Sequence, residues 1–322
     1  MSVLNKRLTT FLCSLFALLL AFALPAMILS SCDRNDSRGR NINVYFTKTD
    51  SISEMSFDDF LVGCVAAITD PSIDYPDEAM RAICLAVESR LLYLCGRCGH
   101  AADKSVDFCD SADDGTGYLS PEQVSDEYGK AVADAFFEKI SSTVSTVIGL
   151  SICYDGAVAL ALTHKSSYLL TENAEAVCGK DYPYLRSVRS YEGKHEELTQ
   201  VSEDILKALV KGRYETDVTA PEITARTPAG RVAKVSLGEK EISGTDFADL
   251  LGIPSTDFTI EHSGNEYLFR SLGEGNGLGM SQMGAIALAL DGYGTEAIIA
   301  AYYPGVTIEK TDIAAILKRS RG

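Results

Sequence analysis

The sequence has few basic residues for its acidic content. Of its 322 residues, 29 are Lys or Arg and 45 are Asp or Glu, a formal net charge of −16. Such a chain has no strongly basic face to neutralise phosphates, so the composition argues against a nucleic-acid partner. Hydrophobic residues make up 46% and charged residues 23%, a balance typical of folded proteins rather than of disordered or collagenous ones. The length suits about two domains or one large one.

Cysteine is too scattered to form a disulfide framework. The nine cysteines are an odd number spread over a long chain, unlike the dense pattern of small disulfide-framed domains. Metal binding and lipid attachment are the roles left open. Cys64, Cys84, Cys153 and Cys178 lie in apolar patterns, and we expect them to be buried packing residues.

No fixed-period repeat and no nucleotide-binding loop is present. Glycines alternate at 273, 275, 277 and 279, but the spacing is not G-x-G-x-x-G and no P-loop lysine accompanies it. The segment Gly279–Gly284 is one residue off the G-x-S-x-G nucleophile elbow, and no particular histidine and acid can be paired with Ser281. These patterns favour neither a nucleotide-binding protein nor a serine hydrolase.

The first 32 residues are predicted to meet a membrane. Lys6 and Arg7 precede an uncharged run over 11–29, whose length lies between a secretory signal and a spanning helix. Leu29–Cys32 then resembles a bacterial lipobox with Cys32 as the lipidated residue, and residues 33–41 form a polar tether. A lipoprotein and an uncleaved single-pass anchor both stay open. In either case the rest of the chain lies outside the cytoplasm, because the basic residues stay inside.

Apolar spacing in the remaining chain predicts both helices and strands. Residues 41–46 alternate polar and apolar side chains, which is typical of a strand. Ser56 with Asp59 resembles a capping box, and the helix that follows should end near Asp70-Pro71. Further expected elements are a helix from Tyr75 to Tyr93, a hairpin turning at Asp155-Gly156, a β-rich stretch over 231–237, a short helix capped by Thr245, and helices over 281–290 and 296–303. Residues 95–127 are predicted to be a loop-like insert, too polar to be core.

The C-terminal part resembles a known family. GEGNGLGMSQMGA over 273–285, followed by YYPG over 302–305, resembles the C-terminal signature of the stage II sporulation protein D family, the SpoIID/LytB domain. Phe60–Ala67 and Glu78–Ala82 resemble two further motifs of that family, and the likeness covers about residues 42–310. It implies one SpoIID-like domain over 42–322, an α+β fold of mixed helices and antiparallel sheet with an N-terminal membrane segment.

The resemblance also implies a function. Members are membrane-anchored peptidoglycan proteins, and the sporulation member is a lytic transglycosylase that cuts glycan strands stripped of stem peptides; relatives include modifiers of cell-wall amidases. The lytic reaction needs one carboxylic acid to protonate the leaving glycosidic oxygen. The expected partners are therefore peptidoglycan glycan strands and a cell-wall amidase, and the alternative to an enzyme is a glycan-binding protein or amidase modifier without catalysis.

The sequence departs from the family at polar site positions. The catalytic glutamate of the family follows V-V-A-A directly, and here that position is Ile68, which cannot transfer a proton. Asp70 is the candidate for a shifted acid, and the alternative is that it caps a turn before Pro71. Asn276 stands where the family has histidine, and Glu88 where the second helix usually carries arginine. These departures predict altered or lost chemistry.

The glycine-rich signature is the candidate substrate-binding segment. Gly277 and Gly279 would let the backbone approach a sugar, while Asn276, Ser281 and Gln282 would offer hydrogen bonds to hydroxyl or acetamido groups. The alternative is a packed turn that starts a helix, with Ser281 as its N-cap.

The insert carries a candidate zinc site. Some family members bind zinc after the second helix, and here Cys95, Cys98, His100 and Cys109 supply three thiolates and one imidazole. Such a set suits a closed, tetrahedral structural zinc. A Cys95–Cys98 or Cys98–Cys109 disulfide, or free thiols, are the alternatives.

Overall fold

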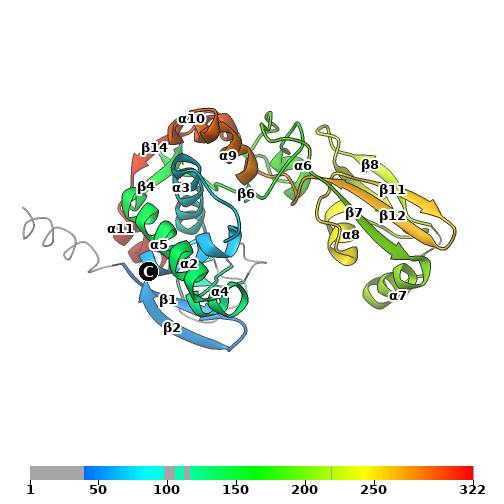
Figure 1. Cartoon of the computed structure of the whole chain (residues 1–322), viewed down its shortest axis with the longest axis horizontal. Coiled ribbons are helices and arrows are strands. Elements are labelled where there is room, and N and C mark those ends of the chain that lie inside the picture. The colour runs from blue at the N-terminus through cyan, green and yellow to red at the C-terminus, as the bar shows by residue number, and fades with distance from the viewer. Residues whose placement is uncertain (1–39, 98–105, 112–116, 219, 322) are drawn as a thin grey trace, which may run out of the picture.

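The chain folds into two lobes with separate hydrophobic cores (Figure 1). The computed structural model describes residues 40–97, 106–111, 117–218 and 220–321. Lobe A comprises residues 40–195 and 273–321, and lobe B comprises residues 196–272, inserted between them. Buried apolar side chains from Ile42 to Leu185 and from Leu278 to Leu317 form the core of lobe A, and those from Val201 to Phe269 form the core of lobe B. Sequence analysis predicted one domain over this range and did not reveal the division.

Two helices at the centre of lobe A begin as predicted. Helix α2 (Phe57–Ile68) has Ser56 as its N-cap, whose Oγ accepts a hydrogen bond from the Asp59 N–H at 3.0 Å. Helix α3 (Asp77–Leu94) follows Pro76 and carries acids in its first turn, where the helix dipole favours them.

Part of the segment predicted to be a polar loop belongs to the core. Strand β1 (Asn41–Phe46) pairs antiparallel with β2 (Ser51–Ser56) and parallel with β3 (Phe108–Cys109). Phe108 is buried because its ring packs on the rings of Phe57 and Phe60 in α2, with centroids 5.9 and 5.3 Å away. Helix α4 (Pro121–Tyr128) also falls within the predicted loop. The prediction of a loop outside the core is therefore wrong for these residues.

The predicted hairpin closes a second sheet of lobe A. Strands β4 (Leu150–Tyr154) and β5 (Ala157–Val158) pair across Asp155-Gly156, whose φ values of 54° and 73° match a tight hairpin turn. Strand β14 (Thr307–Lys310) pairs antiparallel with β4. The other elements of lobe A are α5 (Lys130–Val147), β6 (Thr163–His164), α6 (Ala174–Cys178), β13 (Met280–Ser281), α9 (Gln282–Leu290), α10 (Thr295–Tyr302) and α11 (Ile313–Ser320).

Lobe B consists of two antiparallel sheets and two helices. Its sheets have the strand orders β11-β12-β7 and β10-β9-β8. Helix α8 begins two residues earlier than predicted, because Ser243 has an extended backbone and its Oγ accepts from the Asp246 N–H, so Ser243 and not Thr245 is the N-cap. The elements are β7 (Glu196–Ser202), α7 (Glu203–Tyr214), β8 (Glu222–Arg226), β9 (Val232–Ser236), β10 (Glu241–Ser243), α8 (Gly244–Leu251), β11 (Phe258–Ser263) and β12 (Glu266–Leu272).

The fold class is α+β, with mostly antiparallel strand pairs, as predicted. Cys64, Cys84 and Cys153 are buried as expected, but Cys178 is exposed, because α6 ends there on the surface. Within the described part of the chain, no helix has the length and apolar character needed to cross a bilayer. The predicted membrane segment, Cys32 included, lies outside the described residues.

Candidate functional site

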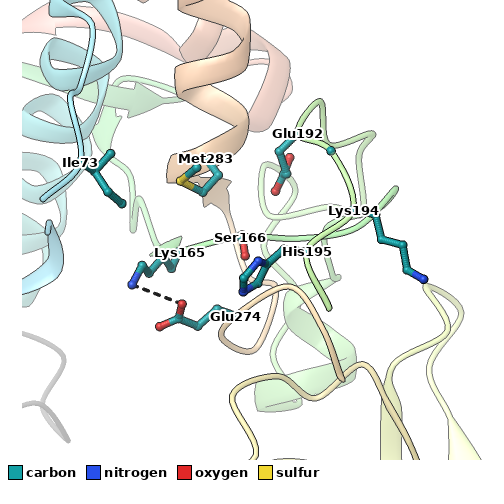
Figure 2. Close-up of a pocket in the computed structure, with 9 residues that line it drawn as sticks. Ile73, Lys165, Ser166, Glu192, Lys194, His195, Glu274 and Met283 are labelled. Carbon is teal, nitrogen blue, oxygen red and sulfur yellow. Dashed lines mark ion pairs between the residues drawn. The ribbon is translucent and has the colours of Figure 1, made fainter. Parts of the chain in front are cut away.

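A pocket of about 410 Å³ lies where the chain passes between the two lobes (Figure 2). Residues from five separate segments line it: the loop after α2, the segment after β6, the segment that enters β7, the segment that leaves β12, and α9. The lining residues are Ile73, Lys165, Ser166, Glu192, Gly193, Lys194, His195, Glu274 and Met283.

Backbone hydrogen bonds hold the floor of the pocket. Ser166 and Glu274 exchange two bonds, from the Ser166 N–H to the Glu274 carbonyl at 3.0 Å and back at 2.9 Å. Gly273 has a φ of +72°, and a Cβ there would lie 2.6 Å from the Ser166 carbonyl oxygen. A side chain at position 273 would therefore push these two segments apart, which explains why the residue there is glycine.

Lys165 joins two carboxylates at the pocket. Its Nζ lies 3.3 Å from Glu274 Oε2, the ion pair drawn in Figure 2, and 3.7 Å from Asp70 Oδ2. Asp70 Oδ1 also accepts from the N–H and the Oγ of Ser72 at 2.9 and 2.6 Å. The Ser72 bonds lower the pKa of Asp70, aided by Lys165 and opposed by partial burial. A group that donates a proton near neutral pH needs a raised pKa instead.

Glu192 is the most highly bonded carboxylate of the pocket, and sequence analysis missed it. Its Oε1 accepts from Ser281 Oγ and from the Ser167 N–H, each at 2.5 Å, and its Oε2 accepts from Ser190 Oγ at 2.6 Å. Figure 2 shows its side chain directed toward the space below Met283. No local spacing rule relates residues 192 and 281, so no signal in the sequence alone connects them.

Ser281 and Gln282 are buried and fully engaged within the protein. Ser281 is the N-cap of α9, and its Oγ accepts from the Gly284 N–H at 3.1 Å. Gln282 Nε2 donates to the Ile68 carbonyl at 2.8 Å, and its Oε1 accepts from the Tyr75 hydroxyl at 3.3 Å. These contacts fix Ile68 against the start of α9. The substrate-binding role of the two residues stays a prediction.

The glycines of the signature make close approaches to the chain itself. Gly277 and Gly279 have φ values of +80° and +70°. A Cβ at Gly277 would collide with the guanidinium of Arg231, and one at Gly279 with the Leu162 carbonyl. Asn276 Oδ1 accepts from the Leu278 N–H at 3.0 Å. Packing within the protein is therefore sufficient to require both glycines, whether or not a sugar also approaches them.

A buried polar cluster joins lobe B to the pocket. Arg231 of lobe B is 2% exposed, and its Nη2 donates to Ser167 Oγ at 2.9 Å. His164 Nε2 lies 2.5 Å from the same Oγ, and its Nδ1 lies 3.0 Å from the Leu278 carbonyl. Burial lowers the pKa of His164 to about 3, so the ring is neutral. Because a carbonyl only accepts, Nδ1 carries the proton and Nε2 accepts from Ser167.

The predicted zinc ligands are only partly within the described residues. Cys98 and His100 lie outside them. Cys95 is half-buried, its Sγ lies 3.2 Å from Ser320 Oγ, and burial raises the pKa of its thiol. Cys109 is buried on β3. In the described part of the chain, no three metal-binding side chains come together. The zinc site stays a prediction.

The chain is similar over most of its length to proteins of one family. No family model matches it. It is 28% identical over 276 residues to stage II sporulation protein D of Bacillus amyloliquefaciens, covering 84% of this chain and 79% of that protein. With stage II sporulation protein D of Bacillus subtilis it shares 26% identity over 276 residues, 84% of this chain and 80% of that protein. An uncharacterized protein of Brachyspira hyodysenteriae is 24% identical over 268 residues. The resemblance seen in the motifs is confirmed: the chain is a relative of stage II sporulation protein D.

Proposed function

We propose that this chain is a sporulation-related protein that binds peptidoglycan glycan strands in the pocket of lobe A beside the connections to lobe B, without the acid of a lytic transglycosylase. One observation carries the proposal. Lobe A lines a pocket where the chain passes to and from lobe B, while the position that the resemblance gives to the family's acid holds Ile68, whose carbonyl is bonded to Gln282. The names of the related proteins support the link to sporulation.

The lining of the pocket supports a sugar as ligand. Ligand sites typically measure about 300–1,000 Å³ and combine apolar walls with a few placed polar groups, and this pocket fits that range. Ile73 and Met283 supply apolar surface, and Glu192 and Glu274 supply carboxylates. Carboxylates accept hydrogen bonds from sugar hydroxyls, and apolar side chains pack on the C–H faces of the ring. Lys165 and Lys194 line the same pocket and supply positive charge, which suits the lactyl carboxylates that muramic acid carries in strands stripped of stem peptides.

Asp70 does not provide a good replacement acid in this geometry. It caps a turn through Ser72 and is paired with Lys165, two contacts that stabilise its charged form. In the lytic reaction an acid must hold its proton until the glycosidic oxygen leaves. The contacts of Asp70 therefore favour binding without cleavage.

A second candidate is a lytic transglycosylase with Asp70 as its acid. One observation favours it: Asp70 lies within reach of Lys165, which lines the pocket. In that reaction Asp70 would donate its proton to the leaving oxygen and then accept the proton of the C6 hydroxyl, which closes onto C1 as the C1–O bond breaks. A bound strand would first have to displace Lys165.

Mass spectrometry separates the two candidates. The full chain is incubated with glycan strands stripped of stem peptides, and co-sedimentation with the strands is measured alongside anhydro-muramic ends. We expect binding with no anhydro ends, and loss of binding on Glu192→Gln with Glu274→Gln. Anhydro ends that disappear in Asp70→Asn would establish the second candidate. A chain that neither binds nor cleaves would refute both.

Three further properties are proposed with this function. The chain acts outside the cytoplasm, held to the membrane by residues 1–32 as a lipoprotein through Cys32 or as a single-pass anchor. The set Cys95, Cys98, His100 and Cys109 holds a structural zinc. A cell-wall amidase is a second partner besides the glycan strand.

A further inference from the structure

Three large side chains are exposed on the segments that also line the pocket. Leu169 is 60% exposed, Leu170 40% and Tyr191 42%. Leu169 follows the pocket residue Ser166 by three positions, and Tyr191 directly precedes Glu192. We call Leu169, Leu170 and Tyr191 the rim patch.

Backbone contacts bring the two segments of the rim patch side by side. The Ser190 N–H donates to the Leu169 carbonyl at 2.8 Å, and Leu170 forms an antiparallel bridge with Arg189. The two leucines therefore lie opposite the residues that lead into Tyr191. The same two segments continue into the pocket wall, where Ser166 and Glu192 line the pocket.

Leu169 has a backbone conformation that a leucine seldom adopts. Its φ is +66°, and the Leu170 N–H donates to the Tyr168 carbonyl at 2.8 Å, which closes a γ-turn on Leu169. A γ-turn with positive φ is rare and strained, and glycine would adopt it freely. Burial does not explain the leucine either, since most of its side chain is in water. An exposed apolar side chain on a strained backbone points to a role in binding.

The aromatic side chain gives the patch the character of a sugar platform. The Arg189 guanidinium lies over the Tyr191 ring, 5.6 Å from its centroid, and the ring packs edge-on against Tyr302. These contacts hold the ring in place with part of its surface in water. Ring faces are electron-rich, and the C–H bonds on one side of a pyranose carry partial positive charge, so sugars pack flat on such rings.

We propose that the rim patch binds the sugars of the glycan strand that follow those held in the pocket. The proposal rests on the proposed function. A pocket of about 410 Å³ lies near the small end of ligand sites, so a polymer cannot lie wholly within it. A strand that leaves the pocket along the segments after Ser166 or before Glu192 meets the exposed apolar and aromatic side chains of the rim patch.

Strand length and one substitution test the proposal. Binding of a disaccharide and of an octasaccharide of peptidoglycan glycan to the full chain is measured by calorimetry. We expect the octasaccharide to bind about tenfold more tightly or better, the effect of covering one large apolar side chain. Leu169→Gly should abolish that gain and leave disaccharide affinity unchanged. Its thermal midpoint should stay equal or rise, because glycine relieves the positive φ.

Two further variants control the test. Tyr191→Phe keeps the ring and should keep the gain with length, whereas Tyr191→Ala should lose it. Ile205→Ala removes a comparably exposed side chain, 55% in water, from α7 in lobe B (Figure 1), and should change nothing.

The outcomes distinguish this proposal from the function on which it rests. If neither sugar binds the wild-type chain, the proposed function fails and this proposal fails with it. If the disaccharide and the octasaccharide bind with equal affinity, the proposed function stands but the rim patch does not bind sugar. That result would be expected if the patch binds a protein or a lipid. An octasaccharide affinity unchanged in Leu169→Gly would also overturn the proposal.

Discussion

Glu88 should make the stability of lobe A fall as pH rises. It is completely buried on α3, its Oε1 accepts from the Gly149 N–H at 2.9 Å, and its Oε2 has no hydrogen-bond partner among the described residues. Burial raises the pKa of Glu88 from 4.5 to about 8, and the charge of Asp58 adds to the rise, while the Gly149 bond and Arg40 oppose it.

The sign follows from which state holds the proton. Between pH 4.5 and pH 8 the folded chain keeps the Glu88 proton that the unfolded chain has released, so the free energy of unfolding decreases with pH. Each pH unit in that range costs about 1.4 kcal/mol, so stability should fall by about 3 kcal/mol from pH 4.5 to pH 7. The charges that act on Glu88 are those of the Asp58–Arg40 ion pair, and Glu88 in turn raises the pKa of the buried Cys84 thiol.

Urea unfolding followed by circular dichroism at several pH values measures this effect. Glu88→Gln cannot titrate and can keep the bond from Gly149, so its stability relative to the wild type should rise steadily between pH 4.5 and pH 7. The amide group can also change the free energy of unfolding by an amount that does not depend on pH. Such a change shifts the whole Glu88→Gln curve and leaves its slope against pH unchanged. Glu138→Gln, at an exposed position of α5, is the matched control and should follow the wild type. Parallel curves for wild type and Glu88→Gln would refute the reasoning.

Three further predictions test the fold and the metal site. Gly279→Ala should cost about 3 kcal/mol in urea unfolding, because a Cβ would meet the Leu162 carbonyl on a backbone with positive φ; an unchanged midpoint would contradict this. Asp107→Asn should cost about 2 kcal/mol in the same assay, since buried Asp107 pairs with Arg321, whose partial exposure weakens the bond; wild-type stability would show the pair to be dispensable. Elemental analysis of the full chain should find zinc that Cys109→Ser lowers; equal metal content in both would dismiss this ligand.

Local patterns in the sequence were sufficient to predict four helices of lobe A, namely α2, α3, α9 and α10. Ser56 caps α2 and Ser281 caps α9 as their positions before apolar periodic segments suggested. The turn at Asp155-Gly156 also needed only its own two residues. Each of these features depends on residues a few positions apart in the sequence. Apolar spacing and helix caps act over the same short distance, so they can be read from the sequence.

Features that depend on distant packing were not predictable. Strand β3 is only two residues long and lies in a polar segment, and its burial comes from the rings of α2 that pack over it. Glu192 acquires its place in the pocket from Ser281, 89 positions away. Asp70 was recognised as a candidate, but its bonds to Ser72 and Lys165, which decide its charge, belong to the folded chain.

The first strand and the last described residue lie next to each other. Arg321 donates to the Asn41 carbonyl and to Asp107, so the last described residue is fixed beside the first strand. In Figure 1 the C-terminal end and β1 lie in lobe A, on the side of the molecule away from lobe B. A tether attached before residue 40 would therefore hold the molecule by that end. Lobe B would then extend away from the attachment point, and the pocket would lie between that point and lobe B.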